Sequence, residues 1–218
     1  MRNFRTEGII IKRRNYGEAD RILTVLTRDY GKISIKAAGV RKITSRRSAH
    51  IELLNHTILH LYKKTNFNIL TEAKMMEDFS AIKEDFQKVG LAYHLCELID
   101  GLCPENQENS TVYFLLRKTL DRLAKSTEII PVQEYPISDI SDYTIGMFGV
   151  GVSDAPQQVT QAVPSRSQLL QDFEIALLSE LGYWNKNDAL AKNFDTHAMI
   201  ESIIERKLKS HAIFAKLQ

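Results

Sequence analysis

The sequence predicts an α+β fold in which a small five-stranded barrel precedes an all-helical domain. From residue 6 to about residue 76, short apolar runs alternate with polar residues at a period of two, which is typical of strands. From residue 80 onward, apolar residues recur every three or four positions, which is the helical period. We expect the short strands to close into a barrel, because closure removes the exposed edges of a small sheet.

The predicted strands are divided by turn-forming residues. Two apolar runs within residues 6–27 form a hairpin whose turn includes Gly17. The third strand covers residues 33–37, where isoleucines alternate with polar residues. The last two strands are predicted at residues 51–62 and 67–76.

The remaining periodic segments are predicted helices. The first begins at Ser80, its expected N-cap, and stops before Pro104. The second is capped by Ser110, a third opens with a capping box at residues 165–168, and the last covers residues 196–209. The inward stripe of the first helix is predicted to contain Ile82, Phe86, Val89, Tyr93, Cys96, Ile99 and Leu102.

These elements divide the chain into a barrel domain of residues 1–78 and a helical domain of residues 79–218. Residues 126–166 hold four of the five prolines and five acidic residues against one arginine. We interpret them as a long loop or partly ordered insertion in the helical domain, either functional or disordered.

The residue patterns of common enzymes are missing from the sequence. There is no phosphate-binding GxxxxGK[ST] motif, and His56 and His60 lack the glutamate of the metalloprotease motif, so we predict that they are surface histidines on one strand face. Cys96 and Cys103 are predicted core cysteines, because two cysteines without nearby ligands make a poor zinc site. We therefore predict a protein that is not an enzyme and holds no cofactor or metal.

No apolar run approaches the length of about 18 residues that a membrane span requires, and the first residues lack the apolar region of a signal peptide. We expect a cytoplasmic protein without a membrane partner, associated with the nucleoid if it binds DNA.

Charge is distributed unevenly along the chain. Residues 1–64 contain 15 Lys and Arg but only 5 Asp and Glu, a balance of +10, whereas the rest of the chain carries −8. Such asymmetry is typical of a module that binds a polyanion, joined to one that does not. The triplet Lys12, Arg13 and Arg14, close to the tip of the predicted hairpin, is the densest part of this charge.

Cations interleaved with aromatic residues predict single-strand binding, because phosphates follow the cations and bases stack on the rings. If about six to eight cations contact phosphates, log affinity should fall against log salt with a slope of about −4 to −6. Charges that serve only solubility, with aromatics in the core, are the alternative. The candidate DNA-binding residues are Lys12, Arg13, Arg14, Tyr16, Arg21, Lys32, Lys36, Arg41, Lys42, Arg46, Arg47, Lys63 and Lys64.

Beyond its cations and aromatic residues, the chain resembles the bacterial RecO family of DNA repair proteins in several sequence motifs. The resemblance is carried by the hairpin sequence of residues 6–27, Gly31-Lys32-Ile33-Ser34, Ala38-Gly39-Val40-Arg41-Lys42, Leu70-Thr71-Glu72-Ala73, and a segment from Phe173 that ends in Leu-Gly-Tyr. It is good over the first 105 residues and patchy beyond them.

The resemblance implies an N-terminal OB-fold barrel, followed by helices, in a recombination mediator. Proteins of this family bind single- and double-stranded DNA and anneal complementary strands. With RecR they help to load RecA onto DNA that is coated by single-strand-binding protein. For this chain the resemblance thus implies DNA, RecR, single-strand-binding protein and, indirectly, RecA as partners.

The chain also departs from the family pattern. Many members carry a four-cysteine zinc site after the Leu-Gly-Tyr segment, whereas residues 185–195 contain no cysteine, so we predict no zinc. A second expectation concerns Arg117, Lys118 and Arg122, which either receive the acidic tail of single-strand-binding protein or form an ordinary exposed helix face.

Two other functions stay open at this point. The basic barrel would also suit an adaptor that binds an acidic protein partner. A nuclease would need clustered carboxylates for metal ions, and the acidic residues of the N-terminal segment are few and scattered.

Overall fold

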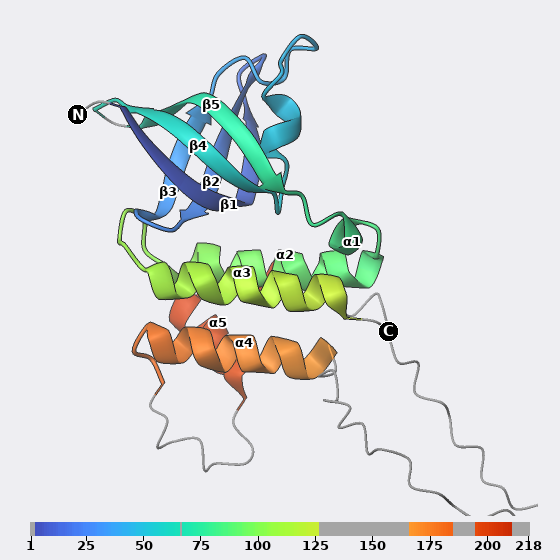
Figure 1. Ribbon diagram of the computed structural model, residues 1–218. Coiled ribbons are helices and arrows are strands. Elements are labelled where there is room, and N and C mark those ends of the chain that lie inside the picture. Colours follow the sequence, from blue (N-terminus) through green and yellow to red (C-terminus); the bar gives the residue numbers. More distant parts are fainter. Residues whose placement is uncertain (1–2, 66, 127–165, 185–194, 211–218) are drawn as a thin grey trace, which may run out of the picture.

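The computed structural model describes residues 3–65, 67–126, 166–184 and 195–210, which form a closed barrel stacked on two layers of helices (Figure 1). The layer next to the barrel contains α2 (Phe86–Leu102) and α3 (Ser110–Lys125). The outer layer contains α4 (Arg166–Glu180) and α5 (Thr196–Ile204). The short helix α1 (Ser80–Lys83) leads from the barrel into the first layer.

The barrel strands are β1 (Asn3–Tyr16), β2 (Asp20–Thr27), β3 (Gly31–Ala37), β4 (His56–Lys63) and β5 (Asn68–Glu77). They are hydrogen-bonded in the order β1-β2-β3-β5-β4, and β4 closes the barrel onto β1. All pairs are antiparallel except β3 with β5, which are parallel and paired at only two positions. This is an OB-fold barrel followed by helices, so the predicted fold class is confirmed.

The run Ile9-Ile10-Ile11 in β1 is buried on both faces of the strand. Because successive side chains point to opposite faces, Ile10 enters the barrel core, while Ile9 and Ile11 pack against the helices. All three are at most 4% exposed. The helices therefore cover one end of the barrel through a shared apolar core. The division into two domains at residue 78 stays a prediction.

The predicted strand at residues 51–62 is wrong in its first part. Ser48–Ile51 forms a 3₁₀ helix, η1, and β4 begins only at His56. Leu54 adopts a left-handed φ of 70°, and its amide donates to the carbonyl of Ile10, where β1 shifts register. Residues 52–55 are thus hydrogen-bonded to β1 at its bulge, and they cannot extend the β4 strand. The final strand begins at Asn68, one residue later than predicted.

The predicted helix from Ser80 is broken into α1 and α2, and Ser80 is not its N-cap. The Asp85 carboxylate caps α2 by accepting from the amides of Gln87 and Lys88, which starts a new helix at Phe86. Asn109, one residue before the predicted Ser110, caps α3 in the same way.

The inward stripe predicted for the first helix is also partly wrong. Phe86 and Tyr93 are 69% and 40% exposed, whereas Leu91 and Leu95 are buried. The reason is that α2 lies between the barrel and the outer helices, so it is buried on more than one side and has no single apolar face (Figure 1).

The last two predicted helices are found with altered ends. Phe173 and Leu177 of α4 are buried as predicted, and Gly182 follows with a φ of +79°. The predicted capping box begins at Ser165, which lies outside the described residues, as do residues 127–165 of the predicted insertion. α5 ends at Ile204 rather than Lys209, because Glu205 adopts a left-handed conformation.

The two helical layers are joined by buried side chains, some apolar and some polar. Cys96 and Cys103 are free and buried, as predicted, and burial raises the pKa of Cys96 to about 12. A buried polar cluster also joins these layers: the His94 ring is 2.6 Å from the Ser210 hydroxyl and 3.2 Å from the Glu174 carboxylate. This cluster links α2 to α4 and to Ser210.

None of the helices in the described ranges is both long and apolar enough to cross a membrane.

We predict that Gly31→Ala destabilises the protein far more than Gly17→Ala. Both glycines have positive φ values, 62° and 57°, so either substitution should cost about 1 kcal/mol of backbone strain. A Cβ on Gly31 would also lie 1.7 Å from the carbonyl oxygen of Gln107, whereas one on Gly17 would meet nothing within 4 Å. We expect a further loss of at least about 2 kcal/mol for Gly31→Ala in urea unfolding. Equal losses for the two variants would contradict the tight contact between the β2–β3 turn and the segment that joins α2 to α3.

Candidate nucleic-acid interface

The β1–β2 hairpin and the loop after β3 lie side by side at the end of the barrel farthest from the helices (Figure 1). The amide of Arg41 donates to the carbonyl of Ala19 at 2.9 Å, and the amide of Gly39 donates to the Asp20 carboxylate at 2.8 Å. The Arg41 guanidinium also reaches the carbonyl of Gly17, at 3.2 Å. The two loops therefore form one surface.

We call this end of the barrel the tip surface. It is formed by Arg14, Tyr16, Arg41, Lys42 and Arg46, all of which are exposed. Lys36 lies beside it on β3, with its ammonium 5.1 Å from the centre of the Tyr16 ring and 3.0 Å from the Asp20 carboxylate. The hydrogen bond from Gly39 and the ion pair with Lys36 lower the pKa of Asp20.

The three consecutive cations of β1 point in different directions. Arg14 pairs in register with Ile22 on the outer side of the barrel, whereas Arg13 pairs with Leu23, whose side chain is in the barrel core. Arg13 accordingly turns over the open end of the barrel, where it and Arg21 share the carboxylate of Glu52.

Lys12 points away from the tip surface. It lies on the same outer side as Arg14, but its ammonium forms an ion pair with Asp100 of α2 at 2.6 Å. Arg14 is the one member of the triplet without a hydrogen bond or ion pair in the described part of the chain.

Two predicted DNA-binding residues are engaged inside the structure. Lys32 is only 6% exposed, and its ammonium donates to the carbonyl of Asp100 at 2.6 Å. The Arg47 guanidinium donates to the carbonyls of Leu70 and Ala38, both at 2.8 Å. These contacts make Lys32 and Arg47 supports of the fold.

A cleft of about 650 Å³ opens in the barrel wall where β3 and β5 stop pairing. Phe4, Tyr30 and Phe67 line it, with the Phe4 and Tyr30 rings packed edge to face at 4.8 Å. Lys63 and Lys64 stand at its β4–β5 side, and the Lys64 ammonium lies 5.6 Å from the Phe67 ring centre. The opposite wall carries the acidic residues Glu105 and Glu108.

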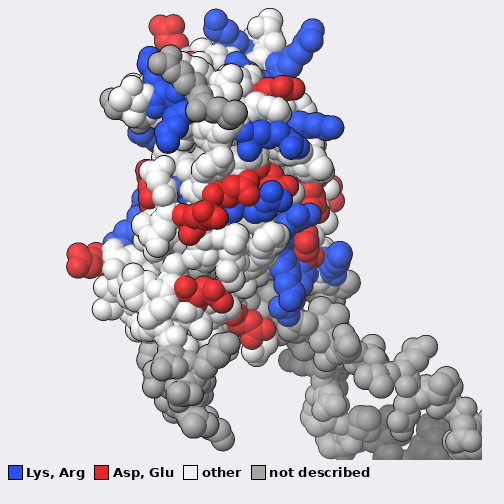
Figure 2. Space-filling view, turned by 60° about the vertical axis from the view of Figure 1, so that its left-hand side comes forward, with Lys and Arg blue, Asp and Glu red and all other residues white. Residues whose placement is uncertain are grey.

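The predicted cations thus separate into paired and available groups. Within the ranges the structure describes, the side chains of Arg14, Lys42, Arg46 and Lys63 form no hydrogen bond or ion pair. The Arg41 side chain bonds only to a backbone carbonyl, and the Lys64 side chain only faces a ring. Figure 2 shows Lys and Arg over the upper, barrel part of the face and again at its lower right, with a band of Asp and Glu, interrupted by Lys and Arg, across the middle. The available charge lies at the tip surface and at the cleft.

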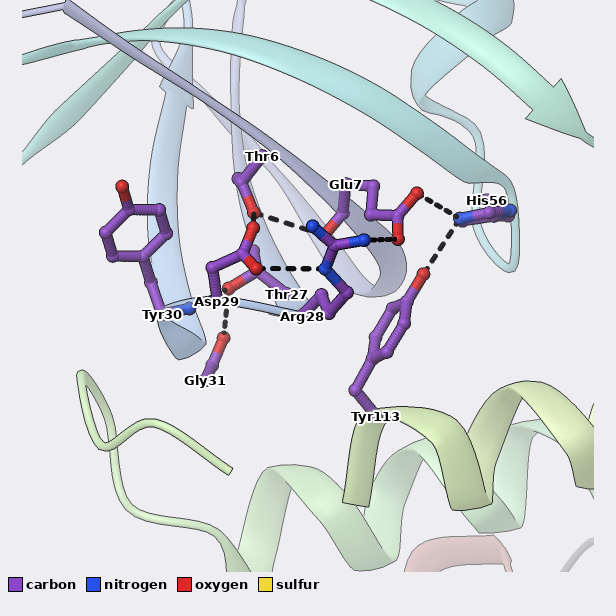
Figure 3. Close-up of polar contacts among 9 residues, drawn as sticks. All are labelled: Thr6, Glu7, Thr27, Arg28, Asp29, Tyr30, Gly31, His56 and Tyr113. Carbon is purple, nitrogen blue, oxygen red and sulfur yellow. Dashed lines mark hydrogen bonds and ion pairs between the residues drawn. The ribbon is translucent and has the colours of Figure 1, made fainter. Parts of the chain in front are cut away.

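A polar network fills the junction between barrel and helices (Figure 3). The Arg28 guanidinium bridges the carboxylates of Glu7 and Asp29, at 3.0 and 2.9 Å. Beside it, the Tyr113 hydroxyl rises from α3 to within 2.9 Å of His56, whose ring also faces Glu7 at 3.9 Å.

The prediction that His56 is a surface histidine is therefore wrong: it is 3% exposed. Burial, with Arg117 adding to it, lowers the pKa of His56, and burial raises the pKa of Tyr113 to about 12. No local pattern could have paired these residues, since 57 positions separate them.

The structure also divides the residues proposed for partner binding. Arg117 acts on both His56 and Tyr113 and so belongs to the junction. Lys118 and Arg122 are exposed and lie four residues apart, on one face of α3 with Phe114. In the described ranges, no three His, Cys, Asp or Glu side chains are placed to hold a metal ion.

Two family models match the chain. Residues 1–79 match the model described as Recombination protein O N terminal, and residues 83–133 match the one described as Recombination protein O C terminal. Together these matches cover the barrel, α2 and α3.

Curated relatives show the same similarity. A DNA repair protein RecO from Roseiflexus sp. (strain RS-1) is 41% identical over 122 residues, which is 56% of this chain and 43% of the relative. One from Heliobacterium modesticaldum is 42% identical over 106 residues, 49% of this chain and 39% of the relative. The match thus spans less than half the length of either relative.

We predict that the free energy of unfolding falls as the pH drops below about 6.5, and that His56→Gln reduces this fall. The folded state holds the pKa of His56 below its ordinary 6.5, so the unfolded state takes up a proton first as the pH decreases. Stability from this residue is complete above 6.5 and is lost toward the lower, folded-state pKa. Urea unfolding across this pH range, with His60→Gln as control, measures the effect. An unchanged pH dependence in His56→Gln would contradict it.

We also predict opposite roles for two neighbouring arginines. Arg47→Ala should lower the free energy of unfolding by about 1–2 kcal/mol, because it removes charged hydrogen bonds to two carbonyls. Arg46→Ala should change it by less than about 0.5 kcal/mol but weaken DNA binding. Urea unfolding and DNA titration of both variants test this, and a stable Arg47→Ala that loses DNA affinity would reverse the assignment.

Proposed function

Since the chain belongs to the RecO family of DNA repair proteins, we propose that it binds DNA through the tip surface and the adjoining cleft of its barrel. The observation that carries the proposal is a group of available cations: Arg14, Arg41, Lys42 and Arg46 at the tip surface, and Lys63 and Lys64 at the cleft. It acts as a recombination mediator and not as an enzyme, in the cytoplasm and on the nucleoid.

The electrostatics favour a ligand that is a polyanion along its length. Each cation that meets a phosphate releases a condensed counterion, so affinity comes from contacts that carry no sequence information. The cleft adds the rings of Tyr30 and Phe67, on which unstacked bases of a single strand can stack. Its acidic wall at Glu105 and Glu108 repels phosphates, so the backbone follows the lysine side.

Strand annealing follows from the same surface. Two single strands repel each other through their phosphates, and a cationic surface that binds both reduces this repulsion. Double-stranded DNA is held by the same phosphate contacts.

We extend the proposal to the partners that the family resemblance implies. With RecR, the protein helps to load RecA onto DNA coated by single-strand-binding protein. The exposed face of Phe114, Lys118 and Arg122 on α3 offers an apolar ring beside two cations, which suits an acidic and hydrophobic tail.

We predict that the reversal of three tip cations, Arg14→Glu, Lys42→Glu and Arg46→Glu, flattens the salt dependence of DNA binding. If about six cations contact phosphates of a single strand, the slope of log affinity against log salt is about −4, and removing three contacts should reduce it by about 2. Fluorescence anisotropy with a short labelled oligonucleotide, titrated across salt, gives the slope. All sequences should lose affinity alike.

A matched variant separates the tip surface from net charge. Lys74→Glu, Lys118→Glu and Arg122→Glu change the net charge equally at exposed positions elsewhere. This variant should keep the wild-type slope. Equal flattening by both triple variants, or no binding by the wild type at low salt, would contradict the proposal.

A further inference from the structure

Ile43 is the most exposed large apolar side chain of the described residues, at 104% relative exposure. It stands in the loop after β3, within the sequence Arg41-Lys42-Ile43-Thr44-Ser45-Arg46. Scattered exposed apolar residues are common, but this one lies within three residues of three available cations, and its whole side chain extends into solvent.

The loop holds Ile43 at its apex. The amide of Ser45 donates to the carbonyl of Lys42 at 2.9 Å, which closes a turn with Ile43 and Thr44 as its central residues. The amide of Lys42 in turn donates to the carbonyl of Gly39.

Both ends of the loop are fixed to the barrel. On one side Arg41 is bonded to the carbonyls of Gly17 and Ala19, and on the other Arg47 is bonded to those of Ala38 and Leu70. The position of Ile43 is therefore set by hydrogen bonds before any ligand binds.

The surroundings of this apex indicate what it meets. Of the carboxylates near the tip surface, Asp20 is engaged by Lys36 and Gly39, and Glu52 by Arg13 and Arg21, whereas Glu18 in the β1–β2 turn is exposed. The four available cations of the tip surface outnumber this one acid. An apolar partner protein would have to bury Arg41, Lys42 and Arg46 unpaired, which is costly. DNA matches both features of the loop. The space between two stacked bases is apolar and can receive Ile43, and the phosphates on either side can bind the neighbouring cations.

We propose that Ile43 is a wedge that inserts between two stacked bases of bound DNA while Arg41, Lys42 and Arg46 hold the flanking phosphates. This rests on the proposed DNA binding and adds a mode of binding to it. Insertion of an apolar side chain at a base step unstacks the bases and bends the strand, and the loss of stacking is offset by burial of the side chain and by the phosphate contacts. In strand annealing, the wedge holds bases apart from their own neighbours so that they can be presented to the other strand.

The test uses oligonucleotides that carry 2-aminopurine, whose fluorescence rises when the base is unstacked, at several positions. One set is single-stranded and the other is duplex. Wild-type protein should raise the fluorescence in at least one set, and Ile43→Ser should lose about half or more of the rise at saturating protein. Because Ile43→Ser keeps every cation, the salt slope of binding should stay as in the wild type.

Two further variants sharpen the result. Ile43→Leu keeps an apolar wedge and should restore the rise, whereas Met76→Ser removes an exposed apolar side chain from β5 and should leave it unchanged. A rise that depends on Ile43 only in the single-stranded set, or only in the duplex set, identifies the form of DNA that receives the wedge. An equal rise with Ile43→Ser in both sets overturns the wedge but leaves DNA binding intact. Absence of binding by the wild type at low salt overturns the proposed function itself.

Discussion

The burial of β1 on both faces at Ile9, Ile10 and Ile11 is the constraint on which the rest of the structure depends. It fixes the helices to one end of the barrel, because Ile9 and Ile11 belong to the core that the helices share. Because the helices cover that end of the barrel, the β1–β2 hairpin and the loop after β3 are left exposed at the other end. A strand that is apolar in its middle and cationic after Ile11 thus joins an anchored end to an exposed one within fourteen residues.

Ion pairing then decides which cations are available to a ligand. Asp100 of α2 engages Lys12 and Lys32, which lie nearest to the helices, and Glu52 engages Arg13 and Arg21 over the open end of the barrel. An engaged cation must lose its carboxylate or carbonyl partner before it can bind a phosphate. The surface that can bind phosphates is therefore smaller than the number of Lys and Arg in residues 1–64 suggests. The charge that is left lies at the positions farthest from the helical acids and beside the cleft.

Two kinds of base contact become available on this surface, and they differ in geometry. The cleft offers aromatic faces in a recess, on which a base that has already left its stack can lie. The tip surface offers a projecting side chain, Ile43, that can enter a stack from outside. Strand β3 contributes to both: Lys36 lies against Tyr16 of the tip surface, and Ile33 and Ser34 line the cleft. The junction network of Arg28, His56 and Tyr113 lies at the opposite end and holds the helices in place.

The period-two runs and the change to helical periodicity near Ser80 were sufficient to predict the barrel and the helices, because each depends on neighbouring residues. The excess of cations before residue 65 is equally local, and the polyanion ligand that it indicates stays a proposal. Local pattern could not separate Arg46 from Arg47, or Lys32 from Lys36, since those differences arise from partners distant in the chain: Leu70 for Arg47 and Asp100 for Lys32. The same holds for His56, which is buried because Tyr113 of α3 covers it. Sequence by itself determined which segments are strands or helices and where the charge is carried. Only the tertiary structure decided which of those charges remain free, because burial and pairing depend on which surfaces the folded chain brings into contact.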